Sequence, residues 1–274
     1  MRYFPKVDFP IPVGYLNKEA AVTGFNYVAP TFVNIGGNHN INLQDIQLDA
    51  DMGDESADIQ ILNEAGLYTE FYWWYKKRTD GQVGPKNYRI PCPEGKVGVW
   101  FLMEFDEDGE IVNATYAADK TIEWGTGYQL NTEEGAVTTF NGEVTDENVN
   151  LAAYCTGFNY FANPYPAEIN IQDIQMDAGM GDESADIQIL NEAGLYTEFY
   201  WWYKKRTGGD VGPKNYRIPC PEGKLGVWFL MEFDEDGEIV NATYAEDKTI
   251  AAGDGIQLNT EEGAEFEIVA PYDL

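Results

Sequence analysis

The residues with the clearest potential for chemistry form an acidic stretch around a glycine. It reads Asp49-Ala-Asp51-Met-Gly53-Asp54-Glu-Ser-Ala-Asp58, with carboxylates at short intervals. Oxygen-rich loops of this kind suit Ca²⁺, although the Glu that ends an EF-hand loop at its twelfth position is missing. We therefore expect Ca²⁺ as the candidate cofactor, and a solvated acidic turn is the alternative. The candidate ligands are Asp49, Asp51, Asp54 and Asp58.

The same stretch occurs a second time. Met52-Gly-Asp-Glu-Ser-Ala-Asp-Ile-Gln-Ile-Leu recurs from Met180, but Gly179 stands where the first copy has Asp51. The two sites are therefore expected to differ in affinity. The candidate ligands of the second copy are Asp177, Asp182 and Asp186.

The repetition extends over most of the chain. Residues 52–135 match 180–263 without a gap, at an offset of 128 and with eight differences in 84 positions. Upstream, Thr23–Tyr27 recurs as Thr156–Tyr160 at an offset of 133, so the first copy carries five additional residues. Fixed self-similarity of this kind indicates repeated structural units. We expect two domains, residues 1–144 and 145–274, which we call the first and the second repeat.

Residue patterns within each repeat are typical of strands. Ala57–Leu62 alternates polar and apolar residues, Leu67–Tyr75 is rich in aromatics, and Val97–Phe105 leads through an Asp-Gly turn into Ile111–Tyr116. The residues on either side of Asn131–Gly135 are expected to form another hairpin. The sequence thus predicts an all-β protein with two tandem, near-identical β-sandwich domains that are jelly-roll-like.

The aromatic run Phe71-Tyr-Trp-Trp-Tyr75 is copied at Phe199-Tyr-Trp-Trp-Tyr203. On a strand, alternate side chains point to opposite faces, so one set fills the core and the other must be covered. A loop, a neighbouring repeat, another subunit or a stacked sugar ring would provide that cover. The residues expected at such a ligand or subunit contact are Tyr72, Trp74, Tyr200 and Trp202.

Basic residues are gathered in one stretch of each repeat, and the remainder is strongly acidic. This basic island comprises Lys76, Lys77, Arg78 and, in the second repeat, Lys204, Lys205, Arg206. A basic patch on an acidic body favours head-to-tail contacts between copies of the chain. Neutralisation by carboxylates of the same repeat is the alternative.

Other chemistry is poorly supported. The one histidine, His39, has no copy in the second repeat, and the only serines are Ser56 and its duplicate Ser184. A Ser-His-Asp arrangement would have to join His39 and Ser56. Acidic residues are so numerous that no catalytic pair stands out. Cys92, Cys155 and Cys220 have no metal-binding spacing and are expected to be small buried side chains. We expect no catalytic residues and no enzyme.

The chain has a formal net charge of −30, from 47 acidic and 17 basic residues. Such a charge argues against nucleic acid as a partner, because phosphate contacts need a basic surface. No apolar run reaches the roughly 18 residues of a membrane span, so no membrane insertion is expected. The partners left are a second copy of the chain, in a homo-oligomer or polymer, and a glycan.

Short motifs of the second repeat resemble a β-sandwich unit found in secreted and surface proteins of Bacteroidetes and related bacteria. They are Thr156-Gly-Phe-Asn-Tyr-Phe-Ala-Asn-Pro-Tyr-Pro-Ala-Glu-Ile-Asn170 and Thr249-Ile-Ala-Ala-Gly-Asp-Gly-Ile-Gln-Leu258, and the first repeat closes with Val137-Thr-Thr-Phe-Asn-Gly-Glu-Val144. The first repeat departs from the opening motif, with Ala29-Pro-Thr-Phe32 in place of the Asn-Pro-Tyr-Pro turn. The resemblance implies extracellular β-sandwich units and transfers no catalytic residue.

These observations favour a non-enzymatic structural protein that self-assembles outside the cytoplasm. A bacterial surface layer or filament is one setting, and a phage virion is the other if Met1 is native. A carbohydrate-binding or adhesin module that uses exposed aromatics is the alternative.

Overall fold

The computed structural model describes residues 13–34, 37–49, 57–62, 68–177, 185–190 and 196–272. These residues form β-strands, connecting turns and two short 3₁₀-helices, so the all-β class is confirmed. The predicted calcium ligands Asp51, Asp54 and Asp182 lie outside the described residues, and so does the side chain of Asp58.

The first repeat contributes thirteen described strands and one 3₁₀-helix. In chain order they are β1 (Val13–Glu19), β2 (Gly24–Val28), β3 (Asn40–Asn42), η1 (Leu43–Asp45), β4 (Gln47–Asp49), β5 (Ala57–Leu62), β6 (Tyr68–Lys76), β7 (Gln82–Val83), β8 (Ile90–Pro91), β9 (Gly98–Phe105), β10 (Ile111–Tyr116), β11 (Thr121–Glu123), β12 (Tyr128–Thr132) and β13 (Val137–Glu143).

The second repeat has the same elements in the same order. They are β14 (Val149–Ala152), β15 (Gly157–Ala162), β16 (Ile169–Asn170), η2 (Ile171–Asp173), β17 (Ile174–Asp177), β18 (Ala185–Leu190), β19 (Tyr196–Lys204), β20 (Asp210–Val211), β21 (Ile218–Pro219), β22 (Gly226–Phe233), β23 (Ile239–Tyr244), β24 (Thr249–Ile250), β25 (Gly255–Thr260) and β26 (Glu265–Ile268).

Each repeat is a sandwich of two antiparallel sheets. In the first repeat, a three-stranded sheet β1-β13-β4 lies against a six-stranded sheet β10-β9-β6-β5-β12-β2. The second repeat has the matching sheets β14-β26-β17 and β23-β22-β19-β18-β25-β15. Short two-stranded pairs, such as β7-β8 and β20-β21, accompany them. Every named strand pairs with strands of its own repeat.

The predicted hairpin between residues 97 and 116 is confirmed, because β9 pairs with β10 in antiparallel register. Its turn is stabilised by Asp106, whose carboxylate accepts hydrogen bonds from the backbone N–H groups of Asp108 and Glu110. Gly109 closes the turn at a φ of 82°, a conformation that glycine adopts without steric cost.

The second predicted hairpin, around Asn131–Gly135, is wrong. Strands β12 and β13 follow each other but belong to different layers, where β12 pairs with β2 and β5 and β13 pairs with β1 and β4. Each strand thus has a hydrogen-bonded neighbour on both sides. If β12 and β13 formed a hairpin in the large sheet, the small sheet β1-β13-β4 would lack its central strand. The turn therefore connects the two layers of the sandwich.

The aromatic strand β6 is covered on both faces by its own repeat. Tyr72 and Trp74 point into the core between the sheets, where Trp74 packs against Trp100 with ring centroids 5.3 Å apart. On the other face, Trp73 and Tyr75 pack in a second cluster with Val83, Phe101 and other residues of the β7–β10 region. The chain between β6 and β9 is therefore the cover that the sequence pattern requires.

A buried glutamine ties the two layers together. The Gln44 side chain donates from Nε2 to the backbone oxygens of Trp100 and Ala117, at 2.9 and 3.0 Å, and its Oε1 accepts from the Trp100 N–H. Gln172 makes the same three bonds in the second repeat. Buried backbone groups must be paired, and this amide pairs the Trp100 N–H and the Ala117 oxygen, while the Trp100 oxygen also accepts from the Ala117 N–H.

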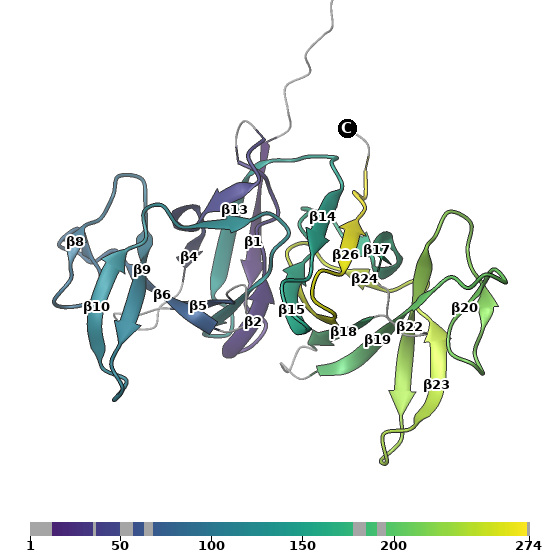
Figure 1. Cartoon of the computed structure of the whole chain (residues 1–274). Coiled ribbons are helices and arrows are strands. Elements are labelled where there is room, and N and C mark those ends of the chain that lie inside the picture. The colour runs from purple at the N-terminus through teal and green to yellow at the C-terminus, as the bar shows by residue number, and fades with distance from the viewer. Residues whose placement is uncertain are drawn as a thin grey trace, which may run out of the picture.

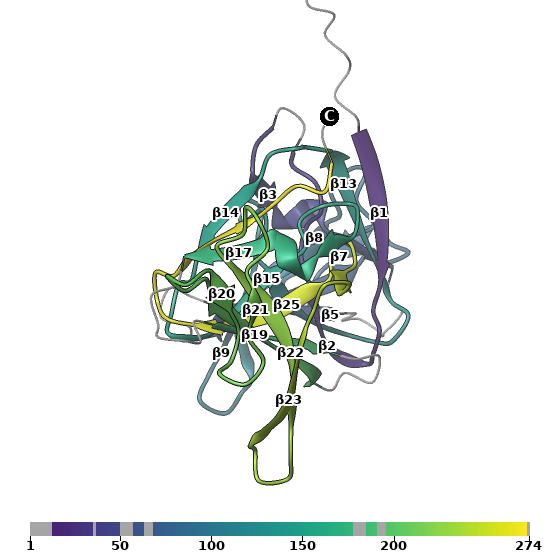
Figure 2. The ribbon, with the colours of Figure 1, turned by 90° about the vertical axis from the view of Figure 1, so that its right-hand side faces the viewer.

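The two repeats meet along the outer strands β2 and β15, and the distal hairpins β9–β10 and β22–β23 lie at opposite ends (Figure 1). Viewed from the side of the second repeat, that repeat stands in front of the first (Figure 2). Tyr27 and Tyr160 stack at this contact with ring centroids 4.7 Å apart. The Gly127 N–H donates to the backbone oxygen of Tyr160 at 3.0 Å. A Cβ atom at Gly127 would lie 2.7 Å from the backbone oxygen of Phe161. Only glycine allows this approach.

Gln44→Met should lower the free energy of unfolding by about 3 kcal/mol, because the buried Trp100 N–H and Ala117 oxygen lose the Gln44 amide while the volume is kept. Urea denaturation measures the change. Gln82→Met makes the same replacement at an exposed side chain and should stay within about 0.5 kcal/mol of the parent protein. Equal effects of the two variants would contradict the role of Gln44.

Candidate functional site

The four aromatic residues predicted at a ligand or subunit contact are core residues. Tyr72 and Tyr200 are each 2% exposed, and Trp74 and Trp202 are each 0% exposed. The prediction of a contact surface is wrong for these four, because the hydrophobic gain of closing the sandwich places them inside. Lys120 lies over the Tyr72 ring at 5.6 Å from its centroid, a cation–π contact that Lys248 repeats over Tyr200 at 5.7 Å.

The basic island is partly neutralised within its own repeat. Lys76 bonds to Asp49 at 3.1 Å, and Lys204 bonds to Asp177 at 2.7 Å. The hydrogen bond and charge of Lys204 lower the pKa of Asp177. The backbone N–H groups of Arg78 and Arg206 donate to residues 82 and 210 and close the turns before β7 and β20. Lys77 and Lys205 are exposed.

The described calcium candidates do not converge. Asp49 and Asp177 face lysines, whereas Asp186 accepts hydrogen bonds from Asn259 at 2.7 Å and from Gln188 at 3.3 Å. Burial raises the pKa of Asp186, and those two bonds oppose the shift. Within the described part of the chain, no three His, Cys, Asp or Glu side chains come together as a metal site would require. The calcium hypothesis therefore depends on the loops outside the described residues.

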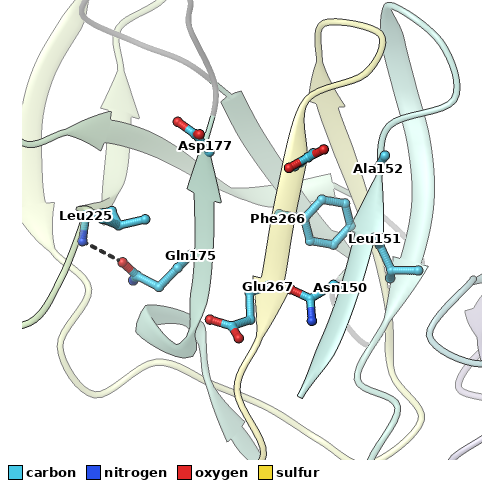
Figure 3. Close-up of a pocket in the computed structure, with 9 residues that line it drawn as sticks. Asn150, Leu151, Ala152, Gln175, Asp177, Leu225, Phe266 and Glu267 are labelled. Atoms are coloured by element: carbon cyan, nitrogen blue, oxygen red, sulfur yellow. Dashed lines mark hydrogen bonds between the residues drawn. The ribbon is translucent and has the colours of Figure 1, made fainter. Parts of the chain in front are cut away.

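A groove of about 390 Å³ lies on the outer face of the sheet β14-β26-β17 (Figure 3). The carboxylates of Asp177, Glu265 and Glu267 border it, and Leu225 closes one side through a 2.9 Å bond from its N–H to Gln175. The first repeat has Val137 and Thr139 in place of the two glutamates. The two glutamates at the border of the groove are therefore specific to the second repeat. In the sequence, the signal for them is the difference between β13 and β26, the last strands of the two repeats.

The outer parts of the two repeats, β6–β10 and β19–β23, lie at opposite ends of the molecule and carry matching exposed residues (Figure 1). We call these outer parts the end surfaces, and each carries exposed lysines and exposed aliphatic side chains at separate places along its strands. On the outer strands, the hydroxyl groups of Tyr88 and Tyr216 donate to the backbone oxygens of Val112 and Val240, at 2.8 and 2.9 Å. In the first end surface, Lys77 and Val97 lie together beside the start of β9, where the Lys77 N–H donates to the Val97 oxygen. Val112 lies in β10 beside the far end of β9, and Lys86 is exposed in the loop between β7 and β8. The equivalent residues of the second end surface are Lys205, Leu225, Val240 and Lys214.

The histidine and the cysteines, the other residues with catalytic potential, pack against neighbouring side chains or are partly buried. His39 approaches Glu147 at 3.2 Å and lies beside Trp124, whereas Ser56 and Ser184 are outside the described residues. The three cysteines are free thiols that are partly buried, and burial raises the pKa of each. A raised thiol pKa lowers the thiolate fraction and hence the nucleophilicity.

No family model, no curated protein and no solved structure matches the chain. The resemblance to Bacteroidetes sandwich units therefore remains a prediction from short motifs. In the described part of the chain, no helix has the length and apolar character of a membrane span.

Millimolar Ca²⁺ should raise the melting temperature, because a ligand that binds only the folded state stabilises it by mass action. Scanning calorimetry with and without Ca²⁺ measures the shift. Lys204→Met should increase the shift, since the lysine competes for Asp177, and Lys205→Met is the matched control at the next position. Unchanged melting at all Ca²⁺ concentrations would refute the hypothesis.

Proposed function

We propose that the chain is a non-enzymatic structural protein, a self-assembling subunit of an extracellular assembly. A bacterial surface layer or filament and a phage virion are the two settings, and the motif resemblance favours the former. One observation carries the proposal: the exposed lysines and aliphatic residues of one outer part recur at the equivalent positions of the other, and the two outer hairpins lie at opposite ends of the chain (Figure 1).

A chain with two like ends is bivalent. When either end binds another copy, the second end stays available, and growth continues unless the geometry closes a ring. The aliphatic residues of the end surfaces support this use, because Val97, Val112, Leu225 and Val240 are each more than half exposed, at 53, 51, 54 and 51%. Because the same side chains are exposed in the same place on both copies, a contact that one end makes is also open to the other end.

Charge gives these ends a complementary target. Lys77 and Lys86 are exposed on a chain with a net charge of −30, so each end surface contributes positive charges to an otherwise acidic body. The acidic groove of the second repeat, bordered by Glu265 and Glu267, is a surface of opposite sign. Contacts between exposed opposite charges weaken as salt screens them.

Strand pairing between chains is disfavoured at these ends. The outer strand β10 contains a register shift between Ile111 and Asn113, and its turn carries Asp106, Glu107 and Asp108. Bulges and charged residues are features that protect sheet edges from pairing with another chain. We therefore propose that the ends associate through side chains.

The alternative, a carbohydrate-binding or adhesin module, required the four aromatic residues to be exposed. Tyr72, Trp74, Tyr200 and Trp202 lie in the cores and offer no face for sugar stacking. A glycan would need a different surface.

Light-scattering chromatography should show species heavier than one chain at low salt that dissociate at high salt, because screening weakens the charged contacts. A single-chain mass at every salt and protein concentration would contradict self-assembly.

Lys77→Glu with Lys205→Glu, which reverses the charge at both ends, should abolish the larger species. Either substitution alone leaves one active end and the acidic groove, so it should weaken the assembly without abolishing it. The two single variants control for each other, since they alter equivalent residues. A double variant that assembles like the parent would show that the lysines of the end surfaces do not join the chains.

A further inference from the structure

The contact between the repeats has the geometry of a two-fold dimer. Ala29 donates its N–H to the Gly253 oxygen, and the counterpart Ala162 donates to Gly125, each at 3.3 Å. Isolated β-bridges repeat the relation, with Val28 opposite Asp254 and Phe161 opposite Thr126. Positions in β2 and β15 correspond at an offset of 133, and those in the loops before β12 and β25 correspond at 128. Exchange of the repeats thus maps each contact onto the other, which defines an isologous interface.

Within the gap-free matching stretch 52–135, the residues at this contact have diverged more than the others. Eight positions differ between residues 52–135 and 180–263, and four of them fall within the six-residue segment 123–128 and its copy 251–256. The four differences are Glu123/Ala251, Trp124/Ala252, Thr126/Asp254 and Tyr128/Ile256. This segment is the one that each repeat presents to the other.

Trp124 makes the first asymmetric contact. It is 3% exposed and lies in the hydrophobic cluster of the second repeat, where its ring meets Tyr165 edge-on at 5.5 Å. Its indole N–H donates to the Pro164 oxygen at 2.9 Å. The reverse contact does not exist, because the counterpart of Trp124 is Ala252 and the counterpart of Tyr165 is Phe32, which packs in the core of the first repeat.

An ion pair makes the second asymmetric contact. Lys18 of the first repeat pairs with Asp254 of the second. At the exchanged positions the residues are Leu151 and Thr126, which carry no charge. A pair of two first repeats would therefore leave Lys18 opposite a threonine, and a pair of two second repeats would leave Asp254 opposite a leucine.

We infer that this contact is a specific pairing of a first repeat with a second repeat, and that it joins neither two first repeats nor two second repeats. Trp124 and the Lys18–Asp254 pair determine this choice. Discrimination of this kind is a difference in association free energy: the matched pair is favoured, and mismatched pairs are weakened by a cavity, a clash or an uncompensated charge. The inference does not depend on assembly between chains. It means that the contact surface around β2 and β15 is already occupied within one chain.

A segment exchange within the full chain tests the inference. One variant combines Glu123→Ala, Trp124→Ala and Thr126→Asp with Ala251→Glu, Ala252→Trp and Asp254→Thr, so that only the positions change and the composition is kept. Its melting temperature should fall by about 10 °C, because Trp124 leaves its cavity and the charged pair is broken. Small-angle scattering should show a larger radius of gyration, since the repeats separate.

The matched control exchanges two differing positions away from the contact, Val97→Leu with Leu225→Val and Ala118→Glu with Glu246→Ala. It should melt within about 1 °C of the parent, as exposed substitutions have small effects. An exchange variant that melts and scatters like the parent would show that the two sides are equivalent and would overturn the inference.

A double-mutant cycle tests the inference with substitutions that leave both cores intact. Lys18→Leu, Asp254→Thr and the double variant should each lower the melting temperature by about 1–3 °C, and the double variant should cost no more than either single one. High salt should reduce all three effects. Additive losses would show that the two side chains act independently and would also overturn the inference.

Discussion

The close approach of backbone to backbone between β2 and β15 is the constraint on which the arrangement of the two repeats depends. Each repeat places a glycine, Gly127 or Gly255, against the outer strand of the other, and a side chain at either position would collide with that strand. Because the glycines remove this obstacle, hydrogen bonds cross the contact and Tyr27 stacks on Tyr160. Gln129 and Gln257 donate to the two tyrosine hydroxyls and hold the rings in place. As a consequence of this pairing, the outer hairpins β9–β10 and β22–β23 lie at opposite ends of the molecule (Figure 1).

Inside each repeat, the sandwich is held by a few residues that reach across its layers. Trp100 and Trp228 are fully buried, and their indole N–H groups donate to the oxygens of Ile46 and Ile174. Together with Gln44 and Gln172, they connect the 3₁₀-helix regions to β9 and β22, the strands next to one edge of each large sheet. Polar groups of this kind cost little when every donor and acceptor is paired, and they fix one packing in preference to others. The conservation of these bonds between the two copies follows from the identity of the residues that make them.

Duplication gives the chain two surfaces of each kind, and the structure uses them differently. One pair of surfaces is joined within the chain, where Trp124 and Asp254 have made the two sides unlike. The other pair, at the ends, has stayed nearly the same, with Val97 and Leu225 as a conservative difference. A contact that is closed within one chain tolerates specialisation, because each side has one fixed partner. The like ends suit the structural role proposed for the chain.

The sequence predicted much of the strand content, because alternation and turn residues act locally. The β5, β6 and β9–β10 segments could be placed from Ala57–Leu62, the aromatic run and the Asp-Gly turn. The partner of β12 could not, since a turn at Asn131–Gly135 is compatible with a hairpin or with a step between layers, and the choice depends on distant strands. The candidate site shows the same limit: the basic and acidic residues were visible, but their pairing as Lys76–Asp49 and Lys204–Asp177 required the fold.

By itself, the sequence determined the duplication, the all-β class and the uneven distribution of charge, because each is a property of residues that are near one another in the chain. The tertiary structure decided which aromatic residues are buried, since both faces of β6 are apolar and only packing shows what covers them. It also decided that the repeats meet through a pseudo-two-fold contact rather than head to tail. That outcome depends on the fit of Gly127, Gly255 and Trp124 against residues more than thirty positions away, and no local pattern encodes such a fit.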